Sequence, residues 1–381
     1  MHIGFDAKRF FHNSTGLGNY SRNTIFGLAE TFPEHRYFLY AAHKSAKICT
    51  IPGRLPITVQ EPCQAGRAMP GLWRTWGLPG TARGHELDIF HGLSHELPVP
   101  RFSGRTRTVV TMHDLLFLTH PHLYPWIDRH IYALKYRASC LRADMIVAIS
   151  AHTATEVCDW LGLAQERVQV VYQSCDSAFL DQADEAARGR VRARYHLPAE
   201  YILFVGSLIP RKGCATLLQA LATLPLSRRI PVLLAGSGPQ EQDLRELAAR
   251  LGLTPLVHFL GRVEQADLPA LYQQAMVFCY PSVGEGFGIP ILEALCSKVP
   301  VITSTGSCFA EAGGDASLYT RPGDIEALAQ ALGQVVEDAD LRQTMIARGL
   351  QHAQKFHPRE TATQLMDLYT ALYQGQDYAP R

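Results

Sequence analysis

The sequence predicts an α/β protein built from two Rossmann-like domains, each a doubly wound parallel sheet, that face each other across a cleft. Three observations predict this fold class. The 381 residues suffice for about two domains of ordinary size. From Tyr201 onward, short apolar runs alternate with segments of helical periodicity, which is typical of buried parallel strands joined by helices. The first half of the chain shows a looser version of the same alternation, and two such domains commonly bind a ligand between them.

The composition excludes several classes of protein. The formal net charge of +1 argues against nucleic acid as a partner. The 9 cysteines stand singly, without a C-x-x-C pair, which disfavours a zinc or redox motif and favours a reducing compartment. The N-terminus does not resemble a signal peptide, and no apolar run approaches the roughly 18 residues that a membrane span requires. We therefore expect a cytoplasmic protein.

The first strand and the loop after it resemble a phosphate-binding unit. A strand is expected over 2–6, followed by a loop with Gly16 and Gly18 and a helix over 20–30. This arrangement can cradle a phosphate, but the glycines can equally serve a tight turn before the helix. Further strands are expected over 36–41, 87–91, 107–112, 144–150 and 167–172, and further helices over 124–141 and 151–161.

Two segments of the first half carry aromatic and basic residues together. Residues 60–86 look irregular and hold Trp73 and Trp76 among arginines. These aromatics could touch lipid headgroups or a sugar, or they could pack onto the core. Helix 124–141 is also rich in aromatic and basic side chains, so peripheral contact with an inner membrane is a further hypothesis.

The domain boundary is expected in the polar stretch 173–199, which reads as a linker. We assign 1–178 to an N-terminal acceptor-binding domain and 179–357 to a C-terminal donor-binding domain. A last helix, within 358–381, is expected to pack back on the first domain. In the second domain, helices are expected over 214–224, 241–251, 266–274, 325–337 and 340–356.

The most informative stretch is YPSVGEGFGIPILEALCSKVP, from Tyr280 to Pro300. It joins an apolar strand to a glycine loop and then to a helix that starts at Ile289. Free N–H groups and the positive end of the dipole make such a helix start an anion site. Glu285 in the loop and Glu293, expected in the first helical turn, bracket this site with hydroxyl acceptors. A nucleotide sugar, with a diphosphate between two polyols, fits this pattern; a simple helix-dipole role is the alternative for Glu293.

Other candidate residues lie in loops that follow strands. Arg211 and Lys212 should share the sheet edge of the glycine loop and could bind a diphosphate, although a solvated pair is the alternative. His113 ends a strand and is either a ligand contact or a core histidine. The pairs His91/His95 and His120/His122 lack a helical glutamate partner, and Asp338/Asp340 reads as a capping turn, so we expect no metal site.

These motifs resemble the retaining GT-B glycosyltransferases with an E-x7-E pattern, which include bacterial mannosyl- and glucosyltransferases for lipopolysaccharide and exopolysaccharide. The resemblance rests on Glu285 to Glu293 within PSVGEGFGIPILEAL, and on VGSLIPRKG, LAGSGP, His113-Asp114 and Gly16-Leu17-Gly18. It spans most of the chain. One departure is Ser297-Lys298, which stands where the family usually has a small residue and a glycine.

The resemblance implies a role for each matched residue. Glu285 would bind hydroxyls of the donor sugar, Glu293 the ribose hydroxyls, and Arg211 and Lys212 the diphosphate leaving group. His113 would contact the donor sugar and support charge at the anomeric carbon. No metal or other cofactor is expected, since protein cations would stabilise the diphosphate. The remaining donor-binding residues would be Gly16, Gly18, Gly206, Arg262, Val263, Gly286, Phe287, Gly288 and Ile289.

The implied activity is transfer of a hexose, with mannose favoured, from a nucleoside diphosphate sugar to a glycan or lipid-linked glycan in cell-surface polysaccharide synthesis. GDP-mannose is the favoured donor, with a UDP-sugar as the alternative. A nucleotide-sugar epimerase of similar fold, or a sugar-nucleotide-binding protein without catalytic activity, are competing interpretations.

Overall fold

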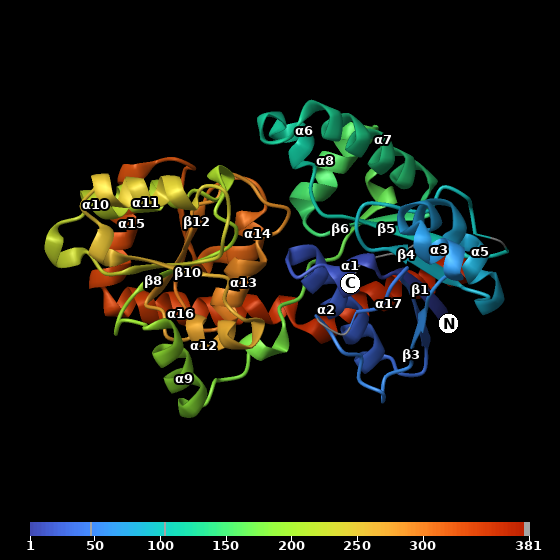
Figure 1. Cartoon of the computed structure of the whole chain (residues 1–381), viewed down its shortest axis with the longest axis horizontal. Coiled ribbons are helices and arrows are strands. Elements are labelled where there is room, and N and C mark those ends of the chain that lie inside the picture. Colours follow the sequence, from blue (N-terminus) through green and yellow to red (C-terminus); the bar gives the residue numbers. More distant parts are fainter. Residues whose placement is uncertain (46–47, 103, 377–381) are drawn as a thin grey trace. The chain divides into compact units, whose positions relative to one another are not determined.

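The computed structural model describes residues 1–45, 48–102 and 104–376 (Figure 1). The chain divides into two compact units. One consists of Met1–Ser174 together with the chain from Phe356 onward, and the other of Cys175–Lys355. The second unit is therefore inserted between two parts of the first.

The first unit contains a seven-stranded sheet in the order β3-β2-β1-β4-β5-β6-β7. Every pair of neighbouring strands is parallel. Most of its strand residues are buried, as expected for a sheet covered by helices on both faces. The strands are β1 (His2–Asp6), β2 (Arg36–Tyr40), β3 (Ile57–Gln60), β4 (Ile89–Gly92), β5 (Arg107–Met112), β6 (Met145–Ala148) and β7 (Val168–Val170).

The last helix of the described chain, α17 (Pro358–Gln374), packs alongside α2 (Gly16–Thr31) in this first unit (Figure 1). It buries Leu365, Leu368 and Tyr369. The Tyr369 hydroxyl is hydrogen-bonded to His91 Nδ1 (2.6 Å), and His91 Nε2 to the Thr111 hydroxyl (2.7 Å). The other helices of the unit are α1 (Lys8–His12), α3 (Gln64–Ala68), α4 (Pro70–Leu72), α5 (Leu78–Ala82), α6 (Leu116–Thr119), α7 (Trp126–Arg142) and α8 (Ala151–Leu161).

The expectation of an irregular segment over 60–86 is wrong, because the chain there forms a series of short helical turns. A π-helical turn, Trp73–Gly77, lies between α4 and α5. Trp73 is buried and donates from Nε1 to the Thr81 hydroxyl (3.0 Å), whereas Trp76 is 55% exposed. Only Trp73 therefore packs onto the core.

Gly16 and Gly18 do not lie in a loop before the helix; they form the first turn of α2. A Cβ atom on Gly18 would lie 1.8 Å from the Asn13 carbonyl oxygen, so this close approach requires glycine. The Gly18 N–H donates to Thr15 O (2.9 Å) and to Asn13 Oδ1 (3.1 Å). The close packing of Gly18 against Asn13 is therefore enough to account for a glycine at this position, without a bound ligand.

The second unit contains a six-stranded sheet in the order β10-β9-β8-β11-β12-β13, again parallel throughout. The two parallel α/β sheets confirm the predicted fold class of two Rossmann-like domains. Reversal of strand order occurs between β8 and β11, and such a switch point is where open α/β sheets bind ligands. The strands are β8 (Ile202–Val205), β9 (Val232–Ala235), β10 (Val257–Gly261), β11 (Val277–Tyr280), β12 (Val301–Ser304) and β13 (Leu318–Thr320).

The helices of the second unit follow the predicted alternation, with additions. The supposed linker over 173–199 contains a helix, α9, and the short elements α14 and β13 follow β12. Lys298, which follows α13, adopts a left-handed conformation (φ 63°) that would favour the glycine expected there. The helices are α9 (Glu185–Tyr195), α10 (Cys214–Thr223), α11 (Glu241–Arg250), α12 (Leu268–Tyr272), α13 (Ile289–Cys296), α14 (Phe309–Gly313), α15 (Ile325–Glu337) and α16 (Ala339–Ala353).

The contact between Tyr369 and His91 gives a test of how α17 is anchored. Tyr369→Phe should lower the free energy of unfolding of the first unit by about 1–3 kcal/mol, because it leaves buried His91 Nδ1 without a hydrogen-bond partner. Urea denaturation followed by circular dichroism measures this change. Tyr373→Phe, at a position 57% exposed on the same helix, is the matched control. Equal stability of the two variants would contradict the proposed anchor.

Candidate active site

Two loops meet at the C-terminal ends of β8 and β11, the switch point of the second sheet. The first loop includes a short 3-10 turn, Pro210–Lys212, and the second runs from Pro281 into α13. Gly213, between the turn and α10, has φ 72°, and a Cβ there would lie 2.0 Å from the Pro281 carbonyl oxygen. Glycine at 213 therefore allows the two loops to touch, which brings Arg211 and Lys212 to the glycine loop.

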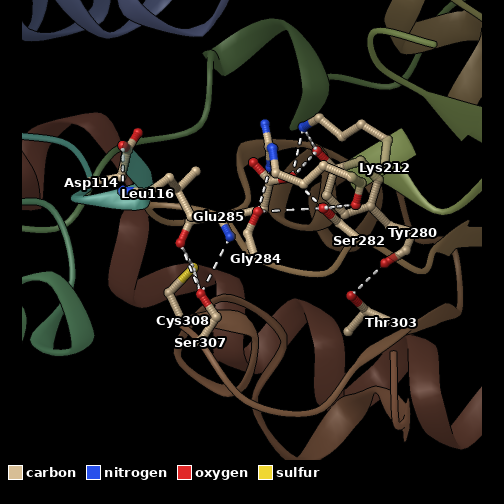
Figure 2. Close-up of polar contacts among 11 residues, drawn as sticks. Asp114, Leu116, Lys212, Tyr280, Ser282, Gly284, Glu285, Thr303, Ser307 and Cys308 are labelled. Atoms are coloured by element: carbon tan, nitrogen blue, oxygen red, sulfur yellow. Dashed lines mark hydrogen bonds and ion pairs between the residues drawn. The ribbon is translucent and has the colours of Figure 1, made fainter. Parts of the chain in front are cut away.

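The carboxylate of Glu285 lies at the centre of this contact (Figure 2). Its Oε1 atom accepts hydrogen bonds from Arg211 Nη1 (2.7 Å), Lys212 Nζ (2.7 Å) and the Ser282 hydroxyl (2.6 Å). The Tyr280 hydroxyl donates to the same oxygen at 3.2 Å, and Lys212 Nζ also donates to Tyr280. The structure thus brings three predicted residues together, and the solvated alternative for the Arg-Lys pair is wrong.

Burial makes these charges depend on one another. The side chains of Arg211, Lys212 and Glu285 are only 15%, 12% and 12% exposed. Burial by itself would raise the pKa of Glu285, but Lys212 and Arg211 outweigh it and hold that pKa below its usual value. Burial lowers the pKa of Lys212, an effect that Glu285 opposes and Arg211 reinforces. With all three groups charged, the cluster carries one excess positive charge, which suits an anionic ligand.

The main chain of the glycine loop is held by residues that the sequence analysis missed. Ser307 accepts from Glu285 N–H (3.3 Å) and donates to Glu285 O (2.9 Å), and Cys308 Sγ also donates to Glu285 O (3.2 Å). The Ser282 hydroxyl contacts Arg211 O (3.2 Å) in addition to Glu285. Ser282 stands three residues before Glu285, so a polar neighbour was visible in the sequence. Ser307 and Cys308 come from the loop after β12, and only the fold brings them close.

The start of α13 lies directly beyond this loop. Gly288 has φ 103°, and the N–H groups of Gly288 and Ile289 make no hydrogen bond to other described residues. Glu293 is in the second turn of α13, not the first, which corrects the prediction and weakens a pure helix-dipole role. It is only 6% exposed, and its Oε2 accepts from the Tyr272 hydroxyl (2.9 Å).

The environment of Glu293 favours the neutral acid. Burial raises the pKa of its carboxyl from 4.5 to about 7; the Tyr272 hydrogen bond opposes this shift and the charge of Asp176 adds to it. The pKa values of Glu285 and Glu293 therefore shift in opposite directions, because only Glu285 has cationic partners. The first is a fixed carboxylate, and the second is a group that titrates near neutrality.

The other predicted donor-binding residues of the second unit lie around the same sheet edge. Gly206 follows β8, and its N–H is already bonded to Ala235 O (3.0 Å). Arg262 and Val263 follow β10, and Arg262 is exposed. Gly286 is half-buried and Phe287 is buried between Glu285 and α13. Their proposed contacts with a nucleotide stay predictions.

In the first unit, His113 lies at the end of β5 and is buried. Its Nε2 donates to Leu93 O (2.8 Å), which fixes Nδ1 as the acceptor of a long bond from Gln173 Nε2 (3.4 Å). Burial lowers the pKa of His113 to about 3, with the nearby His95 adding to the effect. His113 is therefore neutral, and its contact with a donor sugar stays a prediction.

His95 and Tyr20 support His113 and were not singled out as its partners in the sequence. His95 Nε2 accepts from the His113 N–H (3.1 Å), and its ring stacks on Tyr136 at 4.5 Å. His95 has φ 65°, an unusual conformation for a residue other than glycine. The Tyr20 ring meets His113 edge to face at 4.7 Å. The spacing His91-x-x-x-His95 raised only the question of a metal site, and it did not indicate that His95 would accept a hydrogen bond from His113.

No group of three or more histidine, cysteine, aspartate and glutamate residues is arranged to hold a metal ion in the described part of the chain. Asp338 caps α16 by accepting from Leu341 N–H (2.8 Å), so the D-x-D segment is a capping turn as predicted.

The raised pKa of Glu293 predicts a dependence of stability on pH. Between about pH 4.5 and 7, the unfolded chain loses this proton before the folded chain does, so folding stability falls as the pH rises. Glu293→Gln has no carboxyl to ionise. Its free energy of unfolding should therefore exceed that of the wild type by up to about 3 kcal/mol above about pH 8, and should equal it below about pH 4. Denaturant unfolding across this range measures the difference. Exposed Glu246→Gln is the control; a gain from Glu293→Gln that is the same at every pH would exclude the titration.

Comparison with known proteins agrees with this geometry. The family model described as Glycosyltransferase Family 4 matches residues 15–179, and that described as Glycosyl transferases group 1 matches residues 192–352. The chain is 30% identical over 391 residues to O-antigen chain mannosyltransferase B of Escherichia coli, covering 98% of this chain and 100% of that protein. It is also 30% identical over 294 residues to the serotype-specific mannosyltransferase WbdA of Escherichia coli, covering 75% of this chain and 36% of that protein.

A solved structure supports the fold. HepE from Anabaena, in complex with UDP, superimposes with a TM-score of 0.73 at 20% identity, covering 97% of this chain and 99% of that one. The full-length match to the mannosyltransferase, the two family models and the two parallel sheets agree with the resemblance seen in the sequence. The chain therefore belongs to the GT-B glycosyltransferases of the lipopolysaccharide type.

Proposed function

We propose that this glycosyltransferase moves a hexose, with mannose favoured, from a nucleoside diphosphate sugar to a glycan or lipid-linked glycan, with retention of anomeric configuration. The observation that carries this proposal is the buried cluster of Arg211, Lys212 and Glu285 at the switch point of the second sheet. Its excess positive charge next to the start of α13 suits a diphosphate, and its carboxylate suits sugar hydroxyls.

In this proposal the donor lies along the loop and α13. The diphosphate binds Arg211, Lys212 and the N–H groups of Gly288 and Ile289, while Glu285 accepts hydroxyls of the hexose. The ribose hydroxyls bind Glu293, whose carboxyl already accepts a hydrogen bond from the hydroxyl of Tyr272. Main-chain groups of Gly286 and Phe287 complete the phosphate and sugar contacts, Gly206 lies beside them, and Arg262 with Val263 reads the base.

The chemistry follows from where charge develops. As the anomeric bond breaks, negative charge grows on the leaving diphosphate, and preorganised cations stabilise it without reorganisation. Arg211 and Lys212 can supply this stabilisation themselves, so we propose that no metal is required. Their present partner, Glu285, would then exchange cationic partners for sugar hydroxyls as the donor binds.

Residues of the first unit are assigned the remaining contacts. His113 contacts the donor sugar through Nδ1, the ring nitrogen held only by the long Gln173 bond. Its neutral state suits a hydrogen bond to a hydroxyl and excludes transfer of a proton from an imidazolium near neutral pH. Gly16, at the start of α2, offers an N–H to a phosphate. Gly18 is assigned only a supporting role, because its N–H is already bonded.

The favoured donor and pathway rest on the relatives. Both Escherichia coli proteins named above are mannosyltransferases, and one is named for the O-antigen chain, which supports mannose and lipopolysaccharide synthesis. GDP-mannose is the donor that we favour for such a transfer. The structure of HepE with UDP keeps a UDP-sugar as the alternative donor.

Peripheral contact with the inner membrane, on its cytoplasmic face, is the second part of the proposal. Among the described residues, none of the helices combines the length and the apolar character that a membrane-spanning segment needs. Helix α7, however, exposes an apolar stripe at helical spacing, and the same helix bears four basic side chains, a combination that suits anionic lipid. The stripe consists of Ile127 (54% exposed), Ile131 (43%), Leu134 (70%) and Leu141 (47%), and the basic residues are Arg129, Lys135, Arg137 and Arg142.

The catalytic assignment predicts a specific loss. Lys212→Ala should lower kcat/KM for sugar transfer by about 100- to 1,000-fold, the usual effect of removing one donor to a developing anion. Release of nucleoside diphosphate from GDP-, UDP- and ADP-hexoses, in the presence of glycan acceptors, is the measurement. Exposed Lys355→Ala should retain full activity. Absence of turnover in the wild type, with no nucleotide binding at millimolar concentration, would refute the proposed function.

The membrane assignment predicts that the α7 stripe governs vesicle binding. The wild type should co-sediment with vesicles containing phosphatidylglycerol, less so at high salt, and Ile131→Asp/Leu134→Asp should sediment several-fold less. Leu226→Asp, which alters a leucine 81% exposed in the second unit, should sediment like the wild type. If the stripe variant and this control behave alike, α7 does not contact the membrane.

A further inference from the structure

The first unit contains a cavity of about 210 Å³ that the donor site does not use. Asp6, the last residue of β1, and Glu96, which follows β4, both line it. β1 and β4 are adjacent in the first sheet, and strand order reverses between them. The cavity therefore lies at the switch point of its own sheet, the counterpart of the Glu285 cluster in the second unit.

A buried ion network forms the floor of this cavity. Arg74 Nε donates to Asp6 Oδ2 (2.5 Å) and Arg74 Nη1 to Glu96 Oε2 (2.7 Å). The Asp6 and Arg74 side chains are 6% and 16% exposed, and Glu96 is 25% exposed. Lys135 Nζ lies 3.8 Å from Glu96 Oε1. Arg74 thus holds two carboxylates in fixed positions, while Glu96 and Lys135 keep surface on the cavity.

The chemistry of the walls selects a class of ligand. Two carboxylates and a lysine offer acceptors and a donor for hydroxyl groups, and Leu97, Val99 and Leu134 supply an apolar wall. Arg142 also lines the cavity, but its guanidinium nitrogens donate to main-chain oxygens of Leu97, Val99 and Ala138. Since Arg74 is bonded to both carboxylates, an anion would find only Lys135 as a cationic partner and would face both carboxylates. A purely apolar ligand would leave the ion network desolvated without compensation. A polyol ring has hydroxyls for the first surface and C–H groups for the second. The volume is below the roughly 300–1,000 Å³ of pockets for drug-sized molecules, which suits one sugar unit.

We propose that this cavity binds the terminal sugar of the acceptor, with Glu96 and Lys135 hydrogen-bonded to its hydroxyls and Arg74 holding Glu96 in position. The proposal rests on the proposed glycosyltransferase function and identifies the acceptor as a glycan. Leu134 belongs both to the cavity wall and to the exposed stripe of α7, so a lipid carrier of that glycan would meet an apolar surface next to its sugar.

Binding of methyl glycosides of mannose, glucose, galactose and N-acetylglucosamine to the full chain tests the proposal. Saturation-transfer NMR should show at least one of them bound to the wild type, and Glu96→Gln and Lys135→Ala should each weaken that binding about tenfold or more. Glu166→Gln and Arg36→Ala, at exposed positions away from the cavity, are the matched controls and should bind as the wild type does. Because Lys135 is 53% exposed, its variant should fold even if the Glu96 variant does not.

Nucleotide binding distinguishes a failure of the cavity assignment from a failure of the proposed glycosyltransferase function. Thermal shifts with GDP and UDP should be the same in all five proteins, because none of the four substituted residues is assigned a contact with the donor. Failure of every glycoside to bind a wild type that binds a nucleotide would overturn the cavity assignment and leave the donor site intact. Equal glycoside binding by the wild type, Glu96→Gln and Lys135→Ala would overturn it as well. Loss of nucleotide binding in the wild type would instead refute the proposed function.

Discussion

The proposed donor site depends on one constraint, the mutual compensation of charges that burial would otherwise make costly. Glu285 remains ionised because Lys212 and Arg211 contact the same oxygen, and Lys212 in turn depends on Glu285. Gly213 allows the loop of the cations to touch Pro281, and Ser307 fixes the main chain of Glu285. A ligand that takes up the cations must offer hydroxyls to the carboxylate, since removing one partner alone would leave a buried charge unpaired. The cluster therefore favours ligands that carry an anion and a polyol together.

The same strand topology is used in both units. In each sheet the strand order reverses next to the first strand, and charged side chains gather at the carboxyl ends of the two strands concerned. The charge balance differs: the second unit has two cations around one carboxylate, and the first has two cations, Arg74 and Lys135, with two carboxylates. The excess positive charge in the second unit suits a diphosphate, and the charges of the first unit suit hydroxyls. One architecture therefore provides two kinds of binding surface.

The sequence was most informative where local physical rules decide the structure. The amphipathic period of 325–337 matched α15, and the strand–glycine loop–helix pattern located Glu285 correctly. It was least informative where contacts with residues distant in the sequence determine the local structure. Within the helical turns of residues 60–86, Arg74 is bonded to Asp6 and Glu96, which lie outside the segment, and no local pattern reveals those partners. The sequence left Gly18 open between a phosphate-binding and a tight-turn role, and only the fold shows its close approach to the Asn13 carbonyl oxygen. The depth of Glu293 and its bond to Tyr272 also arise from tertiary packing.

The insertion of one unit within the other has a consequence for the order of folding. The chain leaves the first unit at Ser174 and returns at Phe356, whose ring meets Tyr172 edge to face at 5.3 Å. During synthesis, the whole second unit is made after the seven strands of the first sheet and before α17. Only then can α17 pack against α2 and Tyr369 bond to His91. The second unit is continuous and can fold first as one piece, although it is the later part of the chain. A chain that ends between Lys355 and Pro358 would therefore contain the whole second unit but would leave the N-terminal unit without α17.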